Sequence, residues 1–114
     1  MADDAHGADC RLAVYGTLAP GRKNSWVLEP LAGTWSSGVV LGRRVAAGWG
    51  NAEGFPALQL DPQGAEVAVE VFESAELPAH WERLDEFEGD EYARVVAEVH
   101  FPDGVRRANI YVAR

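Results

Sequence analysis

The sequence has one cysteine, few basic residues and no long apolar run. Cys10 has no second cysteine with which to form an intramolecular disulfide. The sequence contains ten Lys and Arg residues and eighteen Asp and Glu residues, which gives a net charge of −8. This charge argues against nucleic acid as a partner, because phosphates repel an acidic surface. No apolar run approaches the roughly 20 residues that span a bilayer, and no signal-peptide pattern is visible. We therefore expect a cytoplasmic protein that binds neither nucleic acid nor membranes.

Several common catalytic and cofactor motifs are also missing. The three histidines and Cys10 lack the spacing of a zinc site. The glycine-rich stretch 48–54 misses the dinucleotide-binding spacing and leads into Pro56 instead of a helix. No Gly-x-Ser-x-Gly elbow and no phosphate-binding Gly-Lys-Ser/Thr sequence occurs. The sequence therefore predicts neither a metal nor a cofactor.

Length and composition fit one small globular domain. The chain has 114 residues, of which 47% are hydrophobic and 25% charged, and it can bury a core of its own. Residues 1–9 are acidic, rich in small side chains and without periodicity, which is typical of a disordered terminus. We expect a disordered tail over 1–9 and a single domain over 10–114.

Short strand-like segments dominate this domain. The alternation of valine with Glu66, Ala68 and Glu70 over 66–72 is typical of a half-buried strand, and Pro102-Asp103-Gly104 is typical of a hairpin turn. About six strands are predicted in total, at 11–15, 38–46, 57–60, 66–72, 93–101 and 105–112.

Only one segment has a convincing helical pattern. It runs from Pro78 to about Glu88, and Gly89 follows in the position that favours a left-handed cap. One helix is too few for the crossover connections of a parallel sheet. We expect an α+β fold, a small mixed, mostly antiparallel β-barrel of about six strands with one main helix.

Glu88 lies on the apolar face of this predicted helix. At about 100° per residue, four side chains fall within about 60° of one another: Leu77, Trp81, Leu84 and Glu88. Burial, the helix dipole and neighbouring acidic residues each raise the pKa of a carboxyl there, and a pKa near neutrality suits a general base that returns its proton. The alternative is that the helix frays at Gly89 and Glu88 joins a solvated acidic cluster.

The first predicted strand breaks at a glycine, within Tyr15-Gly16-Thr17-Leu18. Backbone N–H groups that lose their ladder partners at such a turn can hold a carboxylate or an oxyanion. The same pattern is also typical of ordinary structural turns.

Three segments, taken in order, resemble the signatures of the gamma-glutamylcyclotransferase-like (AIG2-like) superfamily. They are YGTLAPG at 15–21, with Asn24 three residues later, GFPAL at 54–58, and D-x-F-E-G-x-x-Y-x-R at 85–94. The resemblance covers residues 12–112 and implies a small mixed β-barrel with flanking helices around a cavity. It also implies a cyclotransferase, in which the α-amine of a γ-glutamyl amide attacks its own γ-carbonyl and releases 5-oxoproline and an amine.

The resemblance implies roles for particular residues. Glu88 is expected to be the general acid and base, and Tyr15 and Tyr92 are expected to line the pocket. The substrate carboxylate or oxyanion is expected to be held by the backbone N–H groups of Gly16, Thr17 and Leu18. The expected partner is a small γ-glutamyl compound, and the expected assembly is a monomer or homodimer.

Other positions refine these expectations. Arg94 is expected to fix the loop after the helix by pairing with Asp85. Val69 stands where the family commonly has a glycine, which implies a narrower cavity, and Ala19-Pro20 replaces an aromatic of the glutathione-specific branch, which disfavours glutathione. The alternative to an enzyme is a non-catalytic module that binds a carboxylate or amino-acid-like ligand in the same pocket.

Overall fold

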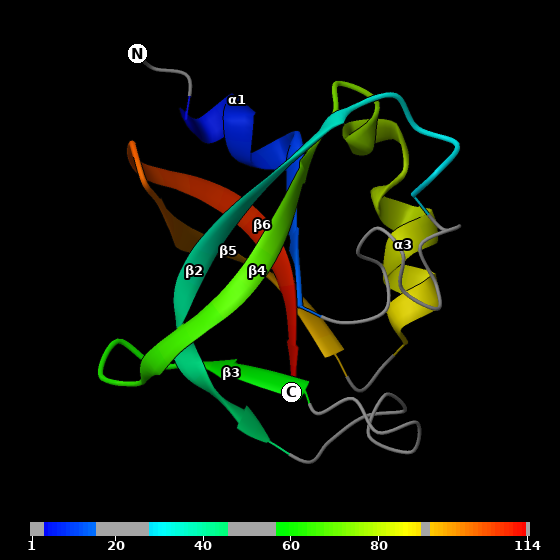
Figure 1. The fold of residues 1–114 in the computed structure, drawn as a ribbon. Helices are drawn as coiled ribbons and strands as arrows, with labels where there is room; N and C mark the ends of the chain where they lie inside the picture. Colours follow the sequence, from blue (N-terminus) through cyan, green and yellow to red (C-terminus); the bar gives the residue numbers. More distant parts are fainter. Residues whose placement is uncertain (1–3, 16–27, 46–56, 90–91, 114) are drawn as a thin grey trace.

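The computed structural model describes residues 4–15, 28–45, 57–89 and 92–113 (Figure 1). No helix in this part of the chain has both the length and the apolar character needed to cross a membrane. The elements in chain order are α1 (Asp4–Asp9), β1 (Arg11–Val14), β2 (Thr34–Val45), β3 (Ala57–Leu60), β4 (Ala65–Glu73), the 3-10 helix η2 (Leu77–Ala79), α3 (Trp81–Glu88), β5 (Tyr92–Phe101) and β6 (Gly104–Ala113).

The six strands form one sheet in the order β3-β2-β4-β1-β6-β5. A further pairing of β2 with β5, at Val39 and His100, closes five of these strands into a barrel and leaves β3 as an extra strand on β2. Among the described strands, β1 and β6 run parallel and the other pairs run antiparallel. The predicted mixed, mostly antiparallel β-barrel with one main helix is therefore confirmed.

The two faces of the strands build two separate apolar clusters. In β1, Leu12 and Val14 join the cluster that packs against α3, while Ala13 between them joins the other cluster, because side chains alternate across a strand. The second cluster contains Val69, which is 2% exposed. Val69, the position at which the sequence resemblance implies a glycine in related proteins, is therefore part of the apolar core.

The single predicted helix is divided in two. Leu77–Ala79 form the 3-10 helix η2, and α3 begins only at Trp81, because the backbone of His80 at φ −118° and ψ 0° departs from helical geometry. Gly89 ends α3 with a positive φ of 88°, which favours glycine as predicted, but its ψ of 179° lies outside the left-handed helical region, so the cap differs from the predicted left-handed one. Figure 1 shows α3 beside the barrel.

The N-terminal residues differ from the sequence expectation of a disordered tail over 1–9. The structure has a helix, α1, over Asp4–Asp9, and Ala8 within it is only 5% exposed. The Asn109 side chain on β6 donates a hydrogen bond to the carbonyl of Ala8 at 2.7 Å. Composition alone could not show this contact, because the partner lies a hundred residues further along the chain.

The closure of the barrel depends on a close approach of two strands at Gly38. A Cβ atom at this position would lie 2.7 Å from Cγ1 of Val99 and 3.0 Å from the carbonyl oxygen of His100, both on β5. We expect Gly38→Ala to lower the free energy of unfolding by about 1–3 kcal/mol, as overpacking does in a tight core. Urea denaturation measures this change.

Ser36→Ala is the matched control, because Ser36 lies on the same strand and is exposed. We expect this variant to stay within about 0.5 kcal/mol of the wild type. Equal stability of Gly38→Ala and the wild type would contradict the tight β2–β5 contact.

Candidate active site

Glu88 is the last residue of α3, the helix whose apolar residues join the cluster that also contains residues of β1 and β6. Leu77, Trp81 and Leu84 are all buried in that cluster, as the predicted apolar face requires. The helix does not fray before Glu88, since the backbone N–H of Gly89 still donates to the carbonyl of Asp85 at 3.1 Å. Glu88 itself is half-buried. Burial, with a smaller contribution from the negative charge of Asp85, raises the pKa of the Glu88 carboxyl to about 7.

Asp85, one turn before Glu88, is held by two neighbouring strands. Its Oδ1 accepts hydrogen bonds from the Tyr111 hydroxyl at 2.6 Å and from Arg94 Nε at 2.9 Å, and Arg94 Nη2 lies 3.4 Å from Oδ2. Burial raises the pKa of Asp85, but the bonds from Arg94 and Tyr111 and the Arg94 charge outweigh this and leave the pKa below its ordinary value. Burial and the bond to Asp85 also raise the pKa of Tyr111 well above its ordinary range. Asp85 is therefore ionised at neutral pH, and Tyr111 keeps its proton.

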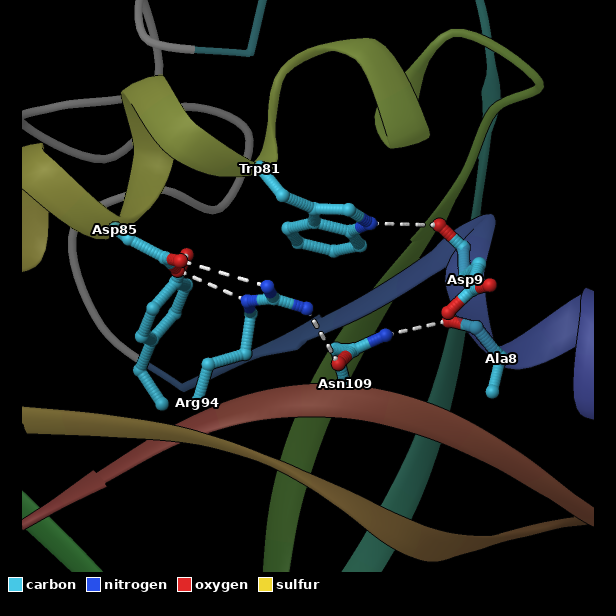
Figure 2. A network of polar contacts seen from close by, with 7 residues as sticks. Ala8, Asp9, Trp81, Asp85, Arg94 and Asn109 are labelled. Carbon is cyan, nitrogen blue, oxygen red and sulfur yellow. Dashed lines mark hydrogen bonds and ion pairs between the residues drawn. The ribbon is translucent and has the colours of Figure 1, made fainter.

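The network continues from Arg94 to the N-terminal helix (Figure 2). The Arg94 guanidinium lies over the Trp81 ring, 4.4 Å from its centroid, and donates to Oδ1 of Asn109 at 3.0 Å. Asn109 donates in turn to Ala8, and the Trp81 indole donates to the carbonyl of Asp9 at 3.1 Å. These contacts join α1, α3, β5 and β6 around one guanidinium.

Part of this network was predictable. The expected pairing of Arg94 with Asp85 is confirmed, as an ion pair at 2.9 Å. Tyr111 and Asn109 were missed, although Asn109 is a polar residue inside the otherwise apolar run 108–113. Tyr111 could have been found only with the strand register, which places it directly opposite Arg94.

An open depression lies along the same side chains. Its lining includes Trp81, Asp85, Gly89, Tyr92, Arg94 and Tyr111. Tyr92, a predicted pocket residue, is therefore placed at this depression, and most of its side chain is buried in the apolar cluster below. Among the described residues, no group of three or more His, Cys, Asp or Glu side chains is close enough to hold a metal ion.

Tyr15, the other predicted pocket tyrosine, links two strands through its hydroxyl. The hydroxyl donates to the carbonyl of Tyr111 on β6 at 2.7 Å and accepts from the N–H of Leu58 on β3 at 3.2 Å. Tyr111 links the two regions only indirectly, because its backbone carbonyl binds Tyr15 while its hydroxyl binds Asp85, one turn before Glu88. Among the described residues, the lining of the depression includes neither Tyr15 nor Glu88. The other predicted substrate-binding residues, Gly16, Thr17 and Leu18, lie outside the described residues, as do Asn24 and the segment 48–56.

The chain is similar to a known family and to several solved structures. A family model described as "Gamma-glutamyl cyclotransferase, AIG2-like" matches residues 12–114. YkqA from Bacillus subtilis is 27% identical with a TM-score of 0.70, and the match covers 92% of this chain but only 36% of YkqA. An AIG2-like protein (ggact) from Mus musculus is 26% identical with a TM-score of 0.69, and the match covers 91% of this chain and 76% of the mouse protein.

A third structure comes from an archaeon. PH0828 from Pyrococcus horikoshii is 26% identical with a TM-score of 0.62, and the match covers 90% of this chain and 76% of PH0828. No curated protein matches the chain. The helix α1 precedes the residues that the family model matches.

The raised pKa of Glu88 predicts a pH-dependent stability. Because folding disfavours the ionised carboxyl, the wild type loses free energy of unfolding as the pH rises from about 4.5 to about 7. Glu88→Gln carries no such charge, so we expect this variant to be more stable than the wild type at pH 8, by up to about 3 kcal/mol, and equally stable near pH 4. Urea denaturation at both pH values tests this.

Glu86→Gln serves as the control, because Glu86 is an exposed carboxylate on the same helix. We expect this variant to match the wild type within about 0.5 kcal/mol at both pH values. A Glu88→Gln variant that is less stable than the wild type at pH 8 would contradict the burial of an ionisable carboxyl at this position.

Proposed function

The chain belongs to the gamma-glutamyl cyclotransferase, AIG2-like family, and we propose that it converts a γ-glutamyl amide into 5-oxoproline and a free amine with Glu88 as general acid and base. The observation that carries the proposal is the half-buried carboxyl of Glu88, which has a pKa of about 7. Glu88 also lies inside the segment 85–94, which resembles the second signature of the family. At neutral pH such a group is present in both protonation states, which a catalyst that takes and returns one proton requires.

The reaction moves two protons from the α-nitrogen to the leaving nitrogen. Ionised Glu88 takes the first proton from the α-ammonium of the substrate, and the freed amine attacks the γ-carbonyl carbon to form a new C–N bond. Glu88 gives this proton to the leaving nitrogen as the tetrahedral intermediate collapses and the original amide C–N bond breaks. The second proton, which the new ring nitrogen still carries, then passes through Glu88 to the released amine, so that the products are 5-oxoproline and an ammonium ion and Glu88 returns to its ionised state without consuming water.

The nucleophile and the carbonyl belong to the same molecule. A site that holds the glutamyl chain in a folded conformation can therefore recover much of the roughly 7–11 kcal/mol that orientation contributes to intramolecular reactions. The protein then needs few catalytic groups. We propose that Tyr15 and Tyr92 line the pocket, while the backbone N–H groups of Gly16, Thr17 and Leu18 hold the substrate carboxylate or the oxyanion, where one donor is worth about 3 kcal/mol.

The proposal is tested by mass-spectrometric detection of 5-oxoproline. The wild type is incubated with a panel of γ-glutamyl amides that includes γ-glutamyl-amino acids, ε-(γ-glutamyl)lysine and glutathione. We expect release from at least one of them, and a loss of about 10²- to 10⁴-fold in turnover for Glu88→Gln with substrate binding retained, because the substitution removes only the proton transfer.

Glu98→Gln is the control for this assay. Glu98 is an exposed carboxylate on β5 outside the network of Asp85 and Arg94, and its variant is expected to keep wild-type turnover. Release of 5-oxoproline that survives in Glu88→Gln would overturn the role of Glu88. Ligand binding by the folded wild type without release from any amide would support a non-catalytic binding module instead.

A further inference from the structure

We propose that Asp85 is a positioning residue for Glu88, whose carboxylate is fixed by Arg94 and Tyr111 so that a permanent negative charge lies one helical turn from the catalytic carboxyl. This inference rests on the proposed role of Glu88. The charge of Asp85 disfavours a second negative charge nearby and so favours the protonated form of Glu88. The network thereby helps Glu88 to hold a proton at neutral pH and to deliver it to the leaving nitrogen.

Helix geometry brings the two carboxyls together. Residues three apart on a helix are neighbours, with Cβ atoms about 5–6 Å apart. The Asp85 side chain is 46% exposed, so that without other contacts it would turn into water, where its charge is screened. The bonds at 2.6 Å from Tyr111 and 2.9 Å from Arg94 hold Oδ1 against the barrel instead. The position of the charge is therefore set by β5 and β6.

The contacts of Arg94 fix Asp85 in place. Two of its guanidinium nitrogens bind Asp85, a third binds Asn109, and its plane rests on Trp81. The guanidinium is therefore itself held by β6 and by the start of α3. Asp85, and not Arg94, is the charged group that acts on Glu88.

Titratable groups on two described elements act electrostatically on Glu88 or feel its charge. They are the Asp85 carboxylate on α3 and the Tyr111 phenol on β6. Asp85 differs from Glu86 in that both of its oxygens are held by hydrogen bonds from the barrel.

The experiment is a carbon-13 NMR titration of the Glu88 carboxyl in the substrate-free full chain. The resonance is assigned as the one that disappears in Glu88→Gln. In Asp85→Asn, which keeps an acceptor oxygen for Arg94 and Tyr111, we expect the titration midpoint to move to lower pH by about half a pH unit or more.

A further variant separates electrostatics from folding. Glu82→Gln removes a negative charge from the same helix at twice the distance along the chain from Glu88, and the midpoint is expected to stay within about 0.2 pH unit of the wild type. A midpoint in Asp85→Asn equal to that of the wild type, or one that shifts equally in Glu82→Gln, would overturn the proposal.

The titration tests the positioning role of Asp85, and the turnover assay tests the proposed function of Glu88. If the midpoint moves as expected but Glu88→Gln retains turnover, the electrostatic coupling stands and the proposed function is wrong. If Glu88→Gln loses turnover but the midpoint is the same in Asp85→Asn and the wild type, the proposed function stands and the positioning role of Asp85 is wrong.

Discussion

The ion pair between Asp85 and Arg94 is the contact on which the rest of the site depends. It joins the helix α3 to strand β5, and through the Tyr111 hydroxyl it also joins that helix to strand β6. Arg94 extends the connection through Asn109 to the N-terminal helix. The last turn of α3 is therefore fixed from several elements, and Glu88 lies at the end of that turn.

The closed barrel explains how so short a chain can hold a carboxyl in a partly apolar setting. One face of β1 fills the core while the other face packs against α3, so that a single strand supports both the fold and the site. The same packing half-buries Glu88 and raises its pKa to about 7. An ionised carboxyl in this setting destabilises the folded state at neutral pH. This loss of stability falls at the position where the proposed reaction needs a proton to move.

Local patterns in the sequence predicted what is local in the structure. The strand alternation at 66–72, the turn at 102–104 and the glycine after the helix each appear where the sequence placed them, because neighbouring residues determine them. The pairing of Arg94 with Asp85 followed from a motif that spans ten residues. Contacts between distant parts of the chain are not encoded in any local pattern. The roles of Tyr111 and Asn109 depend on such contacts, and so does the helix over Asp4–Asp9.

The central claim is that the half-buried carboxyl of Glu88 moves the proton during cyclisation. The most direct test is the pH dependence of kcat/KM for 5-oxoproline formation by the wild type. The account predicts that activity falls on the acidic side with a midpoint near pH 7, the pKa of Glu88 in the free protein. An acidic limb near pH 4.5, the ordinary value for a glutamate, or a rate that does not change between about pH 5 and 8, would contradict it.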